Sequence, residues 1–273
     1  MIVNILGPLE VSDEGVCLLP SAPKTRQLLA LFLLRNGAPV SVAMCLEELW
    51  GPRSPRSAIQ SLHTRVLHIR QTLAASPLIG SQERAKRVLS TAHRAYVLRA
   101  EKEDFDLSRL EDNVAASRDA AAVGDDRAVS TALRAAIRLW RGPTLSDINL
   151  GPYLRARVTG LEEQRLTLTD QCIEAELRLG LHHELLAELG QLTAEYPTYE
   201  NFHAQYMLAL YRSGRAARAL GVYHALRGRL RTELGIEPSP RLREIQTAIL
   251  NADPELTVAP SHGRGLSLDM FSA

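Results

Sequence analysis

The feature that most constrains how this 273-residue chain can fold is a short sequence repeat in its second half. The segment 173–180, Ile-Glu-Ala-Glu-Leu-Arg-Leu-Gly, aligns with the segment 207–214, Met-Leu-Ala-Leu-Tyr-Arg-Ser-Gly, 34 residues further on. In both segments the third residue is an alanine, whose small side chain lets paired helices approach, and the last is a glycine, which permits a tight turn. The matched positions are Ala175 with Ala209 and Gly180 with Gly214. A 34-residue period is that of tetratricopeptide repeats, so this half is predicted to be a stack of helix pairs.

The rest of the second half has the composition and spacing of helices. It is rich in Ala, Leu, Arg and Glu, and its apolar residues recur every three or four positions between breaks at Gly, Pro or Asp. The predicted helices are 107–123, 127–140, 153–179, 184–196, 202–213 and 216–234, and the first two, around Gly124-Asp125, are interpreted as a degenerate repeat. Residues 104–252 are therefore predicted to form an all-α, tetratricopeptide-like domain. The segment 253–273 holds Pro, Ser and Gly with little periodicity and is predicted to be a disordered tail.

The first hundred residues show a different order, in which short strands precede three helices and a hairpin follows them. Turn residues separate the first apolar runs, Pro23 and Ser41 are residues that commonly begin helices, and extended runs surround Ala92-His-Arg-Ala. The predicted strands are 2–6, 9–11 and 16–19, the predicted helices 23–35, 42–50 and 55–73, and the predicted hairpin strands 87–91 and 96–99. This order predicts a winged helix-turn-helix domain over residues 1–100, within a fold that is mainly α with small β elements.

The helix predicted over 55–73 has one apolar stripe and, opposite it, a polar face. The stripe is made of Leu62, Val66, Ile69 and Leu73, which recur at helical spacing. The opposite face carries hydrogen-bonding side chains and bases but no carboxylate, whereas a solvated helix usually mixes Glu with Lys or Arg. Its members are Ser57, Gln60, Ser61, Thr64, His68 and Gln71, flanked by Arg65 and Arg70. Such a face can meet base edges and phosphates, so we interpret it as a DNA-recognition helix.

The charge of the chain is unevenly distributed. Residues 1–100 hold 12 Lys and Arg against 6 Asp and Glu, a net charge of +6, whereas residues 101–273 hold 20 against 25, a net charge of −5. A basic small domain joined to an acidic larger one is typical of a polyanion-binding module attached to a domain with another task.

Basic residues outside the third helix extend the predicted DNA surface. Bases are expected to be contacted by Gln60, Thr64 and His68, and phosphates by the arginines around them. The alternative for all of these side chains is an ordinary solvated surface. The further candidates are Arg53 and Arg56 before the helix, Lys24 and Arg26 at the start of the first helix, and Arg87, Arg94 and Arg99 in the hairpin. In the second helix, Glu47 and Glu48 are expected to face solvent, and Trp50 is expected to lie in the core.

Several classes of function find no support in the residues. The chain has no phosphate-binding loop, no dinucleotide fingerprint, no nucleophile elbow and no His and carboxylate cluster with metal-ligand spacing, so we predict no enzyme, no cofactor and no metal. The cysteines Cys17, Cys45 and Cys172 are far apart and are predicted to be reduced core thiols. No apolar run is long enough to cross a bilayer and no signal peptide opens the sequence, so a cytoplasmic, nucleoid-associated protein is expected.

The order of these features resembles one known family, the Streptomyces antibiotic regulatory proteins. These join an OmpR-like winged helix to a bacterial transcriptional activation domain. The resemblance runs from about residue 6 to residue 254 and is carried by the segments 6–11, 23–31, 49–51, 55–58, 139–143, 207–215, 219–223 and 233–240. The chain departs from the usual family pattern at Ala95, before the wing tyrosine Tyr96, and at Leu67 and His68, where the family more often has a polar residue and an arginine.

The resemblance implies a DNA-binding transcriptional activator of a secondary-metabolite, antibiotic biosynthetic gene cluster. It implies binding to direct repeats in double-stranded DNA near the promoter, and recruitment of RNA polymerase through the sigma factor region, with the loop 51–56 as one contact. A homodimer on DNA is left open. Two alternatives also fit the residues: a helical-repeat scaffold that binds a protein or effector through 104–252, and a repressor that uses the same DNA-binding domain.

Overall fold

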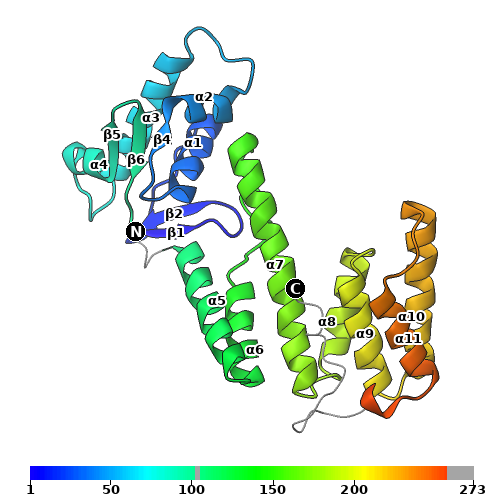
Figure 1. The fold of residues 1–273 in the computed structure, drawn as a ribbon. Coiled ribbons are helices and arrows are strands. Elements are labelled where there is room, and N and C mark those ends of the chain that lie inside the picture. The colour runs from blue at the N-terminus through cyan, green and yellow to red at the C-terminus, as the bar shows by residue number, and fades with distance from the viewer. Residues whose placement is uncertain (102–104, 257–273) are drawn as a thin grey trace. The chain divides into compact units, whose positions relative to one another are not determined.

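The computed structural model describes residues 1–101 and 105–256. Of the disordered tail predicted over 253–273, the part from 257 onward lies outside the described residues. The prediction was wrong for 254–256, which form a 3-10 turn because the Leu256 side chain is buried. The described part of the chain is mainly helical with two small antiparallel sheets, which confirms the predicted fold class (Figure 1). Contacts group the chain into two compact units, the first made of 1–114 and 135–166, the second of 115–134 and the residues from 167 onward. Within the described ranges, every helix is too short or too polar to cross a bilayer. The domain limits 1–100 and 104–252 stay a prediction.

Two three-stranded sheets lie in the first unit. The first has the order β1-β2-β3, built from β1 (Ile2–Asn4), β2 (Glu10–Asp13) and β3 (Val16–Cys17), and Val3 lies opposite Val11 in it. The second has the order β4-β6-β5, built from β4 (Val40–Ser41), β5 (Leu89–Ala92) and β6 (Ala95–Leu98). The pairings between these six strands are antiparallel, so both the opening sheet and the late hairpin are confirmed.

The three helices predicted in the first hundred residues are present. Helix α1 (Pro23–Leu34) begins at a proline, which has no N–H to leave unpaired in the first turn. Helix α2 (Val42–Trp50) is capped by Ser41, whose hydroxyl accepts a hydrogen bond from the Met44 amide at 3.1 Å. Helix α3 (Ala58–Ala74) follows, and a short helix α4 (Gln82–Val88) leads into β5.

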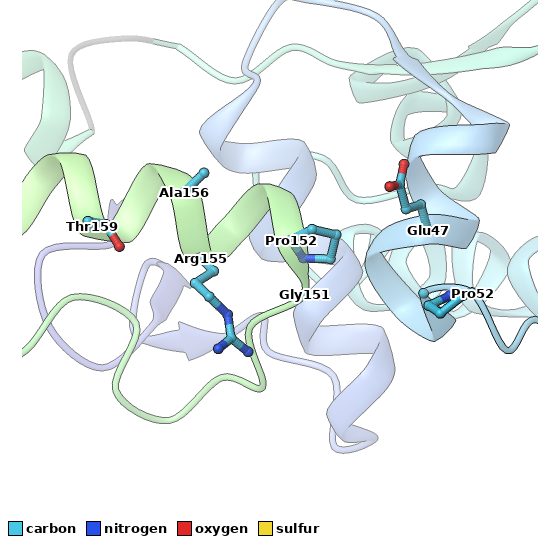
Figure 2. A pocket seen from close by; sticks show the side chains of 8 residues that line it. Glu47, Pro52, Gly151, Pro152, Arg155, Ala156 and Thr159 are labelled. Carbon is cyan, nitrogen blue, oxygen red and sulfur yellow. The ribbon is translucent and has the colours of Figure 1, made fainter.

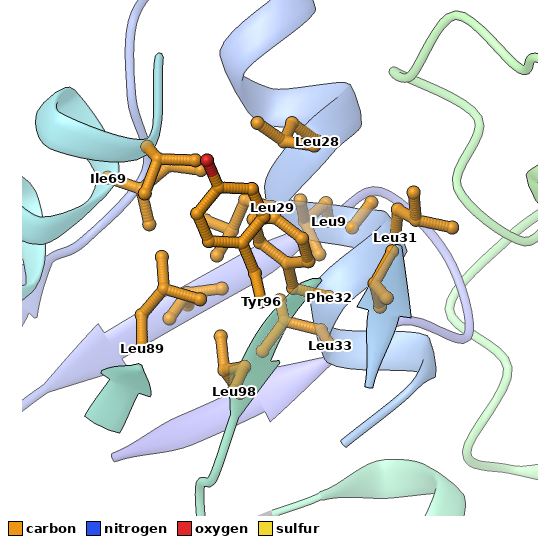
Figure 3. Close-up of a cluster of buried hydrophobic side chains, with 14 of the residues drawn as sticks. Leu9, Leu28, Leu29, Leu31, Phe32, Leu33, Ile69, Leu89, Tyr96 and Leu98 are labelled. Atoms are coloured by element: carbon orange, nitrogen blue, oxygen red, sulfur yellow. The ribbon is translucent and has the colours of Figure 1, made fainter. Parts of the chain in front are cut away.

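A single hydrophobic cluster holds the first unit together. Figure 3 shows Phe32 of α1 beside Tyr96 of β6 among buried aliphatic side chains of α1, α3, β5 and β6. The centroids of the two rings are 5.8 Å apart, and the cluster also includes residues of the first sheet. Leu145, Ile148 and Leu154 belong to the same cluster although they come from the second half of the sequence. The core of the winged domain is therefore completed by residues that the sequence placed in the helical domain.

Carboxylates from several elements tie the same segments together. The buried Asp106 side chain accepts hydrogen bonds from the Ile5 amide at 2.5 Å and the Leu6 amide at 2.7 Å, and Asp147 accepts one from the Leu9 amide at 2.7 Å. Burial raises the pKa of Asp106, although these amide bonds act in the opposite direction. The turn after β1 thus depends on side chains 100 or more residues away in sequence.

All six helices predicted in the second half are confirmed, with small changes in their limits. They are α5 (Asp106–Ala122), α6 (Asp126–Ile137), α7 (Pro152–Arg178), α8 (Leu185–Glu195), α9 (Glu200–Arg212) and α10 (Ala216–Arg229), the last continued by a π-helical turn η2 (Leu230–Leu234). A further helix, α11 (Pro240–Leu250), was not predicted, and a 3-10 turn η3 (Pro254–Leu256) follows it. Its start carried a clear signal, because Ser239 caps it and Pro240 occupies its first turn.

The ends of three helices confirm the repeat. Gly124, Gly180 and Gly214 all adopt a left-handed conformation, with φ of +74°, +81° and +73°. Each is followed by a residue whose amide bonds back to a carbonyl five residues earlier, the bond that closes a helix in the Schellman motif. These bonds are Asp125 N to Ala120 O, Leu181 N to Glu176 O and Arg215 N to Leu210 O, at 3.0, 3.0 and 2.9 Å. The small residues Ala175 and Ala209 are fully buried, as predicted.

An ion-pair network joins three helices of the second unit. The Arg134 guanidinium on α6 lies 2.5 Å from a Glu176 carboxylate oxygen on α7 and 2.6 Å from a Glu188 oxygen on α8. The Ser130 hydroxyl donates to the other Glu176 oxygen at 2.8 Å. Burial alone would raise the pKa of Glu176, but the hydrogen bonds of Arg134 and Ser130 outweigh it and lower that pKa.

Three expectations were wrong. Glu48 is buried, with 2% of its surface exposed, because it accepts hydrogen bonds from a segment far away in sequence. Cys17 is exposed, because β3 is a two-residue edge strand with both side chains at the surface, whereas Cys45 and Cys172 are buried as predicted. Arg87 lies in α4 rather than in a hairpin strand, where it pairs with Glu83 one helical turn earlier at 3.5 Å.

Candidate nucleic-acid interface

Helix α3 is fixed by its apolar stripe and presents its polar face outward. Leu62, Val66, Ile69 and Leu73 are at most 2% exposed, so the helix cannot rotate without exposing them. The predicted face is exposed at Ser57, Gln60, Thr64, His68 and Gln71, and Ser61 is half-buried. The structure therefore brings the predicted base-contacting residues together on one exposed surface.

Two predicted phosphate contacts flank a tryptophan at one side of α3. The Lys24 ammonium lies 4.8 Å from the centre of the Trp50 ring, and the Arg65 guanidinium lies 5.8 Å from it. Both arrangements are cation–π contacts, which hold the cations in place while leaving charge available to an anion. Burial, followed by the charge of Arg65, lowers the pKa of Lys24. Trp50 is half-buried and packs against the core of the first unit, so its ring joins these cations to the core.

Arg70 connects α3 to the wing. Its Nε donates to the Leu89 carbonyl at 2.9 Å and its Nη2 donates to the Thr91 hydroxyl at 2.8 Å. Burial lowers the pKa of Arg70. Two of its donors are thus engaged by β5, so the side chain fixes the angle between the helix and the hairpin as well as adding charge.

The wing is a two-residue hairpin with a basic tip. His93 and Arg94 connect β5 and β6, and His93 takes the left-handed conformation that such a tight turn requires, with φ of +48°. The Arg94 side chain is exposed, while its carbonyl accepts a hydrogen bond from the Val42 amide at 2.9 Å. Arg99 is also exposed, at the far end of β6.

The remaining predicted residues differ in how free their charges are. Arg53 and Arg56 are exposed in the loop between α2 and α3. Arg26 is held near the start of α1, because its Nε donates to the Pro20 carbonyl at 2.6 Å and its guanidinium lies 4.0 Å from Asp147. The loop arginines therefore have the more available charge.

Sequence reasoning missed the part that Glu48 plays beside this surface. One of its carboxylate oxygens accepts from the Gly151 amide at 2.7 Å, and the other accepts from the Tyr153 amide at 2.9 Å and the Leu154 amide at 3.2 Å. The Gly151 amide lies just before α7 and the other two lie in its first turn, so Glu48 of α2 caps that helix. Only the glutamate is visible as a signal in the sequence, because its partners lie more than 100 residues away.

A groove of about 1010 Å³ opens between the end of α2 and the start of α7 (Figure 2). Figure 2 shows Glu47 and Pro52 on one side and Pro152, Arg155 and Thr159 on the other. Its charged groups are already engaged in part, since Glu47 accepts a hydrogen bond from the Tyr153 hydroxyl at 2.7 Å. The groove lies next to the loop that carries Arg53, on the first unit alone.

Comparison with known proteins places this geometry in a family. A family model described as "Bacterial transcriptional activator domain" matches residues 105–250. The regulatory protein DnrI of Streptomyces peucetius is 39% identical over 254 residues, which cover 93% of each chain. The transcriptional regulator RedD of Streptomyces coelicolor is 34% identical and aligns with 94% of this chain and 72% of its own length. The regulatory protein AfsR of Streptomyces griseus is also 34% identical, over 93% of this chain but 25% of its own length.

A solved structure has a similar fold over most of this chain. The structure described as Mycobacterium tuberculosis EmbR in complex with a low-affinity phosphopeptide superposes with a TM-score of 0.84 at 33% identity, over 93% of this chain and 65% of that one. The family that matches this chain and the relatives named above are regulators of transcription and not enzymes. The chain therefore belongs to the Streptomyces antibiotic regulatory protein family of transcriptional activators and carries that family's bacterial transcriptional activator domain.

Proposed function

We propose that this regulator binds double-stranded DNA with α3 in the major groove and activates transcription of a secondary-metabolite, antibiotic biosynthetic gene cluster. The observation that supports this most directly is the exposed, carboxylate-free face of α3, flanked by a basic wing and a basic loop. A helix with amide, hydroxyl and imidazole side chains can donate to and accept from base edges, which carry a distinct pattern for each base pair in the major groove.

The surrounding cations have a separate task in this proposal. Arg53, Arg56 and Arg94 are exposed around the helix and would neutralise phosphates, which sets affinity and register without selecting a sequence. Arg65 and Lys24, held on the Trp50 ring, would add charge at the other side of α3. Arg70 would act chiefly by fixing the wing against the helix.

Binding can be tested with the full chain and a pool of duplexes that carry a randomised centre. We expect a sequence to be enriched, and its affinity to fall steeply with salt, with a slope of log K against log salt of about −0.9 for each phosphate contact. Arg53→Ala and Arg56→Ala should each reduce the magnitude of that slope by about 0.9, the value of one phosphate contact. Arg118 is an exposed arginine of α5, and Arg118→Ala should leave the slope unchanged. Gln60→Ala should instead weaken the preference for particular bases.

The absence of any enriched duplex, or an affinity independent of salt, would refute the proposal. Enrichment of two copies of one motif in the same orientation would support the direct repeat and a pair of protein copies on DNA.

The direction of regulation needs a second experiment. Transcription by bacterial RNA polymerase is measured from a template with the enriched sequence upstream of a promoter, with and without the protein. We propose recruitment of the polymerase through its sigma factor region, with the exposed loop 51–56 as one contact, so the transcript should increase. A decrease would identify a repressor that uses the same surface.

A further inference from the structure

Leu67 lies at the edge of the polar face of α3, about 20° and 40° around the helix from Gln60 and Gln71, and is 47% exposed. Its neighbours one helical turn away are His63 and Thr64 on one side and Gln71 on the other, and all three are exposed. An isobutyl group at this place has no partner in the core, because the stripe that faces the core is Leu62, Val66, Ile69 and Leu73.

The exposure of Leu67 is not a consequence of a loose helix. Val66 and Ile69, its neighbours in sequence, are 2% and 0% exposed, so the backbone on both sides is held by the core. The other exposed aliphatic residue of α3 is Ile59, at 52%. Eight residues at 100° each place Ile59 about 80° from Leu67 around the helix, away from the centre of the face.

The surroundings indicate what could cover this side chain. A protein partner with a matching acidic rim is one occupant for a basic face, but the polar groups around Leu67 are also those that match base edges. The major groove offers one apolar group, the C5-methyl of thymine, and aliphatic side chains recognise it by direct contact. The lack of carboxylates on the face agrees with an occupant that is a polyanion.

We propose that Leu67 reads the C5-methyl group of a thymine and so selects a T·A pair at one position of the binding site. This inference rests on the proposed function, because it needs α3 to lie in the major groove. Contact with a single methyl group removes little area from water, so its loss is expected to weaken binding about three- to fivefold.

The test uses the full chain and the duplex enriched from the randomised pool. Each thymine of that duplex is replaced in turn by deoxyuridine, which lacks only the methyl group, and the dissociation constant is measured each time. The wild-type chain should bind about three- to fivefold more weakly when the thymine at one position of the enriched motif is substituted. The chain with Leu67→Ala should bind the two duplexes equally, because it no longer reaches the methyl group.

A matched variant serves as the control. Leu78 is a second exposed leucine of the first unit, at 60%, and lies in the loop after α3. Leu78→Ala should retain the full loss on deoxyuridine substitution. Both replaced side chains are exposed in the free protein, so both variants should fold, which circular dichroism can verify.

The outcomes separate the inference from the function it rests on. An enriched duplex that binds equally with thymine and deoxyuridine at every position would overturn the contact of Leu67 and leave the proposed DNA binding standing. The same holds if Leu67→Ala keeps the methyl dependence, or if the enriched sequence contains no preferred T·A pair. Failure to enrich any duplex would overturn both.

Discussion

Replacing Glu48 with alanine should destabilise the first unit far more than an ordinary helix substitution does. The side chain is 2% exposed, and its two oxygens accept hydrogen bonds from the amides of Gly151, Tyr153 and Leu154 and from the Gln27 side chain at 3.1 Å. Loss of a helix cap costs about 1 kcal/mol, and leaving buried donors without an acceptor costs about 1–3 kcal/mol more. We therefore expect Glu48→Ala to lower the free energy of unfolding by about 3 kcal/mol.

The protein carries a convenient reporter for this measurement. Its two tryptophans, Trp50 and Trp140, both lie in the first unit, so urea unfolding followed by tryptophan fluorescence reports on that unit. The neighbouring Glu47→Ala is the matched control. Glu47 is exposed, and its side chain accepts a hydrogen bond from the Tyr153 hydroxyl rather than from buried backbone amides. Glu47→Ala should cost about 0.5 kcal/mol or less. A change below about 0.5 kcal/mol for Glu48→Ala would refute the assignment of Glu48 as the cap of α7.

Three further outcomes follow from the structure. Arg134→Met should destabilise the second unit by about 3 kcal/mol, because Glu176 and Glu188 lose their shared cation. Hydrogen exchange of the α8 amides should become faster, and unchanged exchange would argue against the network. Because burial raises the pKa of Asp106, the contribution of Asp106 to stability is complete below its unfolded pKa near 3.8 and is lost as the pH rises through its folded pKa. Over that pH range Asp106→Asn should gain stability relative to wild type, and urea titrations at several pH values would measure the gain. A difference between the two proteins that does not change with pH would contradict this. Burial raises the pKa of Cys45 and of Cys172 to about 12. A thiol reagent at pH 8 should therefore modify the exposed Cys17 alone in the folded protein and all three cysteines in urea. Rapid reaction of a second cysteine without urea would contradict the burial of Cys45 and Cys172.

Local sequence patterns predicted most of the helices and strands. The spacing of Leu62, Val66, Ile69 and Leu73 located α3 and its outward face correctly, since a helix must bury whichever stripe is apolar. The repeat around Gly180 and Gly214 likewise predicted two helix ends, because a left-handed residue at that position favours glycine.

Long-range partners could not be read in the same way. Glu48 looked like a solvent-facing residue because a carboxylate on a short helix usually is one, and its amide partners around Gly151 follow in no fixed spacing. The hydrogen bond from Arg70 to the Leu89 carbonyl could not be predicted either, because no fixed sequence spacing relates the two residues. Helix α11 is a different case, since its start signal, Ser239 followed by Pro240, is local in the sequence.

The candidate DNA surface was predictable as a set of residue types and positions on one face, because period and charge alone define a helix face. Which of its members are free and which are held by neighbours required the structure. Arg53 and Arg94 stayed exposed, whereas Arg26 is engaged by Pro20 and Asp147.

The indole of Trp50, with a cation from α1 on one contact and a cation from α3 on another, gives the protein an optical probe of its own. An indole's emission depends on the electric field across its ring, and the Lys24 and Arg65 cations, 4.8 and 5.8 Å from the ring centre, contribute to that field. Any anion that draws either cation from the ring changes that field. With Trp140 replaced by phenylalanine, the fluorescence emission wavelength of Trp50 would report ligand binding without an attached label.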